Sequence, residues 1–351
     1  MKQRPASFIG ARRIALLGVV CALGLSSCKK ENAPNWWKNL WGSDKETEVA
    51  PPAPVAVNHE QAEMLDYMIY SVGALVSQQA SNPLWREEVR DMRNRLENYY
   101  NGMEARGASL AERVKLGLFL ANATRDLTAY DQALEIYNTT LANWEALPEE
   151  VRNSVEGRRS RSAIANGMGS CYLARRKTAD AMPFYEKALE IDMALFNELA
   201  PANDAPLPSG DALPADLARS AEDVLSSIRC LGECQFLAED PEEARDTYKR
   251  GQELAMRMKN LSPAISIQYI RLLSAMGNLE SRCGQPRQAY AAWTTAAGIA
   301  QRLRQVVSSP SLQAQIVRYM RELEPSIKSV AKQLEETQRA EAEQEAAAGQ
   351  Q

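Results

Sequence analysis

The chain has 351 residues, of which 45% are hydrophobic and 25% are charged, and its formal net charge is -4. This composition is that of a globular protein, and the acidic balance disfavours a nucleic-acid-binding protein, which would usually be basic. The single histidine, His59, weakens the case for acid–base catalytic sites and for zinc sites.

The chain begins with a segment typical of a secretory leader. Four basic residues fall within the first 13 positions, and residues 14–27 are then uncharged. At about 1.5 Å per residue this run would reach about 21 Å, which is short of a bilayer core of about 30 Å. We therefore expect residues 1–27 to be a cleaved signal peptide rather than a membrane-spanning helix.

The uncharged run ends in Leu25-Ser26-Ser27-Cys28, which resembles the lipobox of bacterial lipoproteins. The resemblance implies that Cys28 is lipidated and becomes the first residue of the mature chain. Several acyl chains on one cysteine would hold the protein firmly at a membrane. Because Lys29 rather than Asp follows the cysteine, the family's sorting rule implies the outer membrane. The alternative is a plain signal peptide with an incidental cysteine.

Residues 28–57 are expected to form a flexible tether. They combine polar residues with a Pro-rich stretch, PPAPVAV, which favours an extended spacer. Three tryptophans, Trp36, Trp37 and Trp41, lie within six positions of this tether. They would either rest at the lipid headgroups, where Trp is favoured, or form a short docking segment or helix.

Helix formers dominate the rest of the chain, and strand-like alternation is missing, so we expect an all-α fold. The first expected helix covers residues 59–79, and Asn82-Pro83 opens a second helix that ends near Tyr100. Residues 149–176 contain no proline, so one helix of up to 28 residues fits there. Four prolines within residues 199–216 predict a loop.

Further helix boundaries are expected in the last third of the chain. Ser262-Pro263 begins a helix, Gly284 ends it, and Pro286 begins the next. Ser309-Pro310 opens another helix, and Pro325 is expected to interrupt it before a last helix that caps the array.

Four segments share one pattern of small and aromatic residues: YDQALEIYNTTL, TADAMPFYEKAL, DPEEARDTYKRG and QPRQAYAAWTTA. Each has an alanine, with an aromatic residue four positions later and another small residue twelve positions earlier. The alanines are Ala133, Ala181, Ala244 and Ala289; the aromatic residues are Tyr137, Tyr185, Tyr248 and Trp293; the earlier small residues are Ala121, Gly169, Gly232 and Gly277. Such repetition predicts stacked helical pairs.

This pattern resembles the tetratricopeptide repeat (TPR). The resemblance implies a TPR-like right-handed α-α solenoid, in which small residues let the two helices of a pair approach and the aromatic residue fills the wedge between pairs. The alanines are separated by 48 (133 to 181), 63 (181 to 244) and 45 (244 to 289) residues, against about 34 in the standard repeat. Long helices and the Pro-rich loop would account for the difference. The repeat domain is expected over residues 58–336, followed by a low-complexity acidic tail, 337–351, of frayed helix or disorder.

The resemblance also implies that the first helix of each pair contributes side chains to a groove that binds a protein or peptide. By position these partner-binding candidates are Asn122, Arg125, Asn166, Ser170, Arg229, Glu233, Asn278 and Arg282. Asn and Arg suit this role because they hydrogen-bond peptide backbones and carboxylates. For each candidate, a solvated helix face is the alternative.

The four remaining cysteines, Cys171, Cys230, Cys234 and Cys283, fall on expected helices. Disulfides are possible in an exported protein, but the i,i+4 spacing of Cys230 and Cys234 rarely suits one. We expect small core residues, and we expect no metal site.

The sequence therefore predicts a lipid-anchored scaffold of the bacterial cell envelope that binds a protein or peptide partner. The alternative is a surface or periplasmic lipoprotein that binds a glycan or another nutrient, for which exposed aromatic residues would have to converge on one cavity. An enzyme, a cofactor and a nucleic-acid partner are not expected.

Overall fold

The computed structural model describes residues 85–200, 213–258 and 261–348, and every regular element in these ranges is an α-helix. The helices are α4 (Trp85–Asn101), α5 (Leu110–Asp126), α6 (Tyr130–Glu145), α7 (Glu149–Asn153), α8 (Val155–Ala174), α9 (Thr178–Leu199), α10 (Ala215–Leu237), α11 (Pro241–Arg257), α12 (Pro263–Arg282), α13 (Pro286–Val306) and α14 (Pro310–Ala348). The all-α prediction is confirmed for this part of the chain.

Several predictions fall outside the described residues. They are the signal peptide, the lipidation site Cys28, the tether 28–57 with its three tryptophans, the helix over 59–79, and the start of a helix at Asn82-Pro83. The predicted end of that second helix near Tyr100 agrees with the end of α4 at Asn101.

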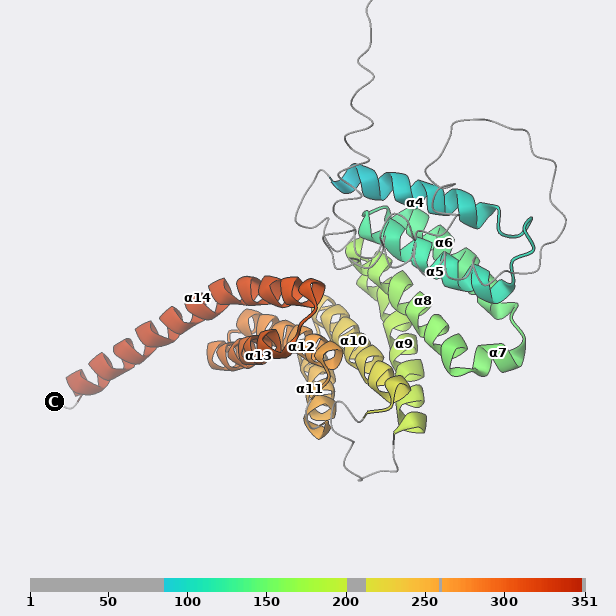
Figure 1. Cartoon of the computed structure of the whole chain (residues 1–351). Coiled ribbons are helices and arrows are strands. Elements are labelled where there is room, and N and C mark those ends of the chain that lie inside the picture. Colours follow the sequence, from blue (N-terminus) through green and yellow to red (C-terminus); the bar gives the residue numbers. More distant parts are fainter. Residues whose placement is uncertain (1–84, 201–212, 259–260, 349–351) are drawn as a thin grey trace, which may run out of the picture.

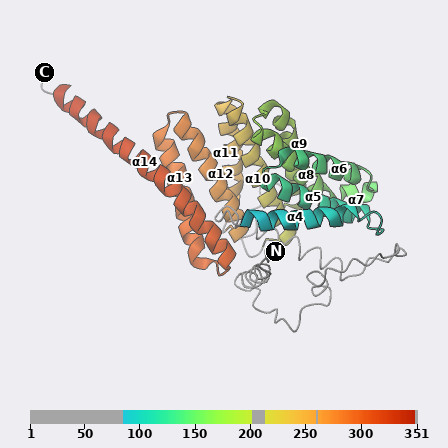
Figure 2. The ribbon, with the colours of Figure 1, turned by 90° about the horizontal axis from the view of Figure 1, so that it is seen from above.

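The helices pack as consecutive pairs. Four pairs, α5–α6, α8–α9, α10–α11 and α12–α13, are each formed by neighbours in the sequence. Each pair also packs on the next, and the first helices α5, α8, α10 and α12 contact one another in that order. Figures 1 and 2 show the helices following one another in chain order from α4 to α14. This arrangement is that of an α solenoid.

The two helices of every pair are joined by the same three-residue turn. Its middle residue has a positive φ, of 65° at Thr128, 59° at Arg176, 65° at Glu239 and 71° at Gly284. In each turn the third residue donates its backbone N–H to a carbonyl five positions earlier, as from Ala129 to Thr124 and from Gln285 to Glu280. This is the Schellman motif, which satisfies the last carbonyls of a helix. Gly284 was the predicted stop; the other three turns carry no sequence signal of this kind.

The repeated small and aromatic residues form the contacts between helices. All four alanines are fully buried, and the four aromatic side chains are between 0% and 4% exposed. A Cβ added to Gly232 would overlap the Tyr248 ring, and one added to Gly277 would overlap Trp293. These aromatic rings therefore pack on the first helix of their own pair. Tyr137 additionally lies against Gly167 of the following pair, in the predicted wedge position.

The single helix predicted over residues 149–176 is wrong, because the chain breaks at Ser154. Its backbone is extended, with φ -62° and ψ 159°, and its side chain caps α8 by accepting from the N–H of Gly157 at 3.1 Å. Trp144 of α6 donates its indole N–H to the carbonyl of Gly157 at 2.7 Å. The cap and this contact together set the start of α8.

The predicted interruption at Pro325 is also wrong, because α14 runs without a break from Pro310 to Ala348. Ile316, Leu323 and Val330, spaced by seven residues, are 0% to 6% exposed and pack into the largest core cluster. Their packing on both sides of the proline holds the helix together. Beyond residue 336 the helix continues through most of the predicted tail and extends away from the other helices in both views (Figures 1 and 2).

The remaining features concern the cysteines and membrane spans. All four described cysteines are free thiols; Cys171 and Cys234 are buried, and Cys230 and Cys283 are half-buried. In residues 85–200, 213–258 and 261–348, no helix has the length and apolar character needed to cross a membrane.

Candidate binding groove

The eight partner-binding candidates lie along the first helices of the four pairs and line two adjoining cavities. Asn122, Arg125, Asn166 and Ser170 line the first cavity, of about 470 Å³. Glu233, Asn278 and Arg282 line the second, of about 340 Å³. Arg229 lines both, as does Arg271, which sequence reasoning had missed. We call the two cavities together the first-helix groove.

Two of the candidates also hold tyrosines of the repeat pattern. The carboxamide oxygen of Asn122 accepts a hydrogen bond from the Tyr137 hydroxyl at 2.6 Å. The Ser170 hydroxyl accepts one from Tyr185 at 3.2 Å. Burial raises the pKa of both phenols above the ordinary range. Asn122 and Ser170 therefore link the two helices of their pairs, and their groove-facing polar groups are partly occupied.

Three further candidates are closer to solvent. Arg125 forms an ion pair with its neighbour Asp126 at 2.8 Å. Asn278 is exposed, and the guanidinium of Arg282 lies over the Phe236 ring, 5.5 Å from its centroid. Asn278 and Arg282 are exposed, so these two side chains are free to reorient when a ligand enters.

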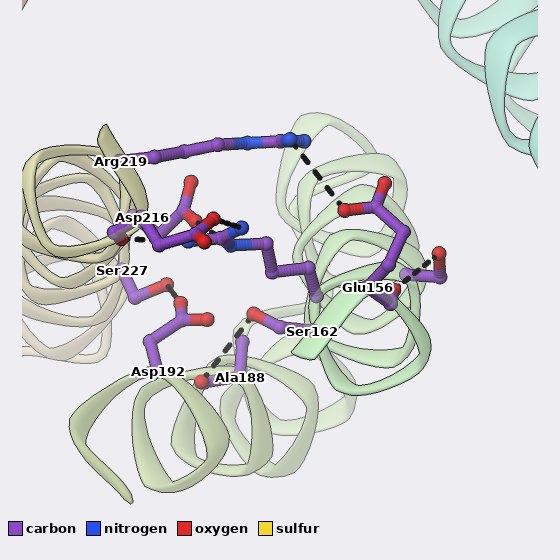
Figure 3. A network of polar contacts seen from close by, with 10 residues as sticks. Glu156, Ser162, Ala188, Asp192, Asp216, Arg219 and Ser227 are labelled. Atoms are coloured by element: carbon purple, nitrogen blue, oxygen red, sulfur yellow. Dashed lines mark hydrogen bonds and ion pairs between the residues drawn. The ribbon is translucent and has the colours of Figure 1, made fainter. Parts of the chain in front are cut away.

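Asn166 is tied into a buried polar chain, of which Figure 3 shows the part from Ser227 to Asp192. Its amide nitrogen donates to the Ser227 hydroxyl at 2.7 Å, and Ser227 donates to a carboxylate oxygen of Asp192 at 2.6 Å. Asp192 is 1% exposed, and burial raises its pKa. The second oxygen of Asp192 and the carboxamide oxygen of Asn166 are buried and lack hydrogen-bond partners in the described part of the chain. The groove therefore has unsatisfied acceptors at its floor.

Arg159 crosses from α8 to Asp216 of α10. Its guanidinium donates to the side chain and to the backbone carbonyl of Asp216, at 2.9 and 2.7 Å, and its Nε lies 3.6 Å from Asp223. Partial burial, followed by the charge of Asp192, raises the pKa of Asp223 to about 7. Arg219 pairs with Glu156 across the opening at 3.5 Å.

The first cavity is rich in arginine. Five arginines line it, namely Arg125, Arg159, Arg219, Arg229 and Arg271, against three carboxylates, Glu156, Asp192 and Asp223. Two of those carboxylates have raised pKa values, so they hold less negative charge at neutral pH than free aspartates would. Four of the five arginines are paired with carboxylates, and Arg271 forms no ion pair in the described part of the chain, so the cavity keeps one cation without an acidic partner. Such a cavity attracts anionic groups.

Aromatic side chains border the second cavity. They are Phe236, Tyr248, Trp293 and Tyr319. Tyr248 and Trp293 are only 2% and 4% exposed, because they belong to the contacts between helices. Arg282 covers part of Phe236, and Arg318 lies over the Tyr319 ring, which leaves little open aromatic surface for stacking on a sugar.

Comparisons with known proteins give likenesses among solved structures only. No protein-family model matches the chain, and no curated protein matches it. The chain is similar to a solved structure titled as the crystal structure of BtubC (BKLC) from P. vanneervenii. Sequence identity is 18%, coverage is 70% of this chain and 94% of that one, and the TM-score is 0.42. A likeness at that score does not bear on function.

Proposed function

We propose that this protein is a lipid-anchored scaffold of the bacterial cell envelope, and that it binds a protein or peptide partner in the first-helix groove of a TPR-like, right-handed solenoid. Cys28 would carry the lipid, and the lipid would attach the protein to the outer membrane. Residues 28–57 would span the distance from the membrane to the folded domain. No cofactor and no enzymatic activity belong to this proposal.

One observation carries the binding role. The eight candidates occupy equivalent repeat positions in four separate segments, and together they line two adjoining cavities. The groove runs along the first helices of four successive pairs, so an extended ligand could contact several repeats at once. Its mixture of arginine, asparagine and serine side chains suits hydrogen bonds to a peptide backbone and to carboxylates.

Photo-crosslinking in cells tests the binding role. A photoreactive residue at Asn278, which is exposed in the groove, is expected to capture a partner that mass spectrometry identifies as a protein. The matched control places the same residue at Arg250, which is exposed on α11 outside the groove. Equal capture at both positions, or none at Asn278, would contradict groove binding. Capture of a glycan alone would favour the nutrient-binding alternative.

Cell fractionation tests the anchor. The Cys28→Ala variant is expected to move from the membrane to the soluble fraction, while Cys21→Ala, a control within the predicted leader, stays in the membrane fraction. Membrane retention of Cys28→Ala at the wild-type level would refute lipidation at this residue.

A further inference from the structure

We propose that Arg229 and Arg271 form the anion-recognition point of the first-helix groove, and that the segment bound there is an acidic peptide with one carboxylate side chain seated against both guanidiniums. This inference rests on the proposed function, because it names the chemistry of the ligand in the same groove.

The two arginines occupy the centre of the groove. Arg229 comes from α10 and Arg271 from α12, which are successive first helices in contact. Both side chains line both cavities, so a ligand that extends from one cavity into the other passes them. They join the half of the groove built by α5 and α8 to the half built by α12 and α14.

The donors of this pair are only partly used. Arg271 donates to the neutral Gln268 side chain at 3.3 Å and forms no ion pair within the described ranges. Arg229 pairs with Glu233 at 3.2 Å and contacts the Cys230 sulfur at 3.1 Å, while its Nε is buried without a hydrogen-bond partner. Since each guanidinium carries five N–H donors, several remain for a ligand.

The electrostatics around the pair also call for a negative charge. The Arg229 side chain is only 16% exposed, and Arg271 is half-buried. Burial, followed by the like charge of Arg229, lowers the pKa of Arg271. Glu233, the carboxylate paired with Arg229, is 48% exposed and partly screened by solvent, and Arg271 has no carboxylate partner in the described part of the chain.

A carboxylate on a peptide fits these observations better than nucleic acid does. A planar guanidinium binds a carboxylate through two parallel hydrogen bonds, and two guanidiniums can share its two oxygens. The chain's net charge of -4 opposes a long polyanion. Asn278 and Arg282, further along the second cavity, are placed to hydrogen-bond the backbone that follows the acidic side chain.

Fluorescence polarisation with a labelled hexaglutamate peptide tests the inference on the purified full-length protein in detergent. Binding is expected at low salt and is expected to weaken as salt rises, whereas a hexaglutamine peptide binds at least ten times more weakly. Arg271→Gln should weaken hexaglutamate binding about tenfold or more, and Arg271→Lys should weaken it less, because lysine keeps the charge and loses the bidentate geometry. Arg250→Gln, outside the groove, should leave binding unchanged.

Several results would overturn the inference. Wild-type affinity in Arg271→Gln would do so, and so would equal binding of the two peptides. Displacement of hexaglutamate by inorganic phosphate at equal molar concentration would indicate a site for free anions rather than for a peptide.

If Arg271→Gln does not melt cooperatively, Arg271→Lys carries the test, and it must then bind hexaglutamate more weakly than the wild type does. Crosslinking at Asn278 separates the two proposals: a partner captured equally by wild type and Arg271→Gln leaves the groove function standing and removes only the arginine pair.

Discussion

At the scale of single residues, the four connecting turns show where the chain accepts local strain. Each turn needs a residue in the left-handed region, and only one of the four has the glycine that adopts it freely. Thr128 is the least suited of the others, because a β-branched side chain is strained at positive φ. Its side chain is exposed, so packing does not offset the strain.

We therefore expect Thr128→Gly to raise the free energy of unfolding by about 1 kcal/mol, through relief of backbone strain. Urea denaturation measures the change. Thr139→Gly provides the matched control, because Thr139 is exposed within α6, where replacing threonine with glycine should cost about 0.3–0.5 kcal/mol. Destabilisation by both substitutions would show that the turn at Thr128 carries no strain.

A second residue-scale prediction concerns Asp223 and pH. The pKa of Asp223 in the folded state is about 7, above the ordinary value near 4 for an aspartate. Between these values the folded state holds a proton that the unfolded state has released, so this group's contribution to stability is lost as the pH rises toward 7. Asparagine cannot ionise and removes this dependence.

Asp223→Asn changes the free energy of unfolding, and this change should be about 1 kcal/mol more stabilising at pH 8 than at pH 5. This figure is smaller than the full shift implies, because the side chain is 38% exposed and partly screened. Thermal unfolding of both proteins at the two pH values gives the difference. A difference that does not change with pH would contradict the assignment.

At the scale of elements, helix pairing depends on small residues opposite aromatic rings. Gly232 is fully surrounded, and a methyl group added there would overlap the Tyr248 ring. Gly298 lies in the interior of α13, where the nearest atom to an added methyl group is 3.7 Å away, at the end of the flexible Arg302 side chain. The same substitution should have opposite effects at the two sites.

Gly232→Ala is expected to lower the free energy of unfolding by about 1–3 kcal/mol, because the α10–α11 pair must separate or Tyr248 must leave its rotamer. Gly298→Ala should raise it by about 0.5–1 kcal/mol, because alanine favours the helix. Equilibrium urea unfolding of both variants makes the comparison. Stabilisation by Gly232→Ala would mean that close approach of these helices does not require glycine.

The same elements show what the sequence could predict. Helix pairing follows from local spacing, so Ala133, Tyr185 and Gly277 were placed correctly from sequence alone. Helix continuity depends partly on tertiary contacts: the Ser154 cap and the Trp144 contact together set the start of α8, and core packing carries α14 through Pro325. The two tertiary contacts leave no local signal, because each joins a helix to a different one, whereas the Ser154 cap is a local signal that the sequence reasoning missed.

The residues of the first-helix groove could be predicted only where repeat position marks them. Repeat position placed Asn166 and Arg229 on the first helices, and the fold puts both in the groove. Asp192 was missed because it reaches the groove from a second helix, and Arg271 because it lies two turns before the position that the repeat marks. Asn166 contacts Ser227, which is 61 residues away in the sequence, so such contacts depend on how the pairs stack.

At the scale of the whole molecule, the array of helix pairs ends in α14, whose first half is packed on the core and whose second half is exposed. The first half of α14 packs on α13 through Leu323 and its apolar neighbours, which belong to the core. From residue 335 to 344 nearly all of its side chains are exposed, and the ion pair between Arg287 and Glu341, at 3.9 Å, joins two side chains that are more than half exposed. Ion pairs of this kind contribute little to stability.

A chain that ends at Glu336 should therefore keep the stability of the full-length protein to within about 0.5 kcal/mol, because residues 337–344 are exposed and bury almost no apolar surface. Leu323→Ala in the full-length chain is the contrasting change. Leu323 is 5% exposed, so this substitution should cost about 2–5 kcal/mol through lost burial and the cavity that it leaves. Urea denaturation followed by circular dichroism compares the three proteins. A large loss on truncation would place residues 337–351 within the cooperative unit, and a neutral Leu323→Ala would show that α14 is not part of it.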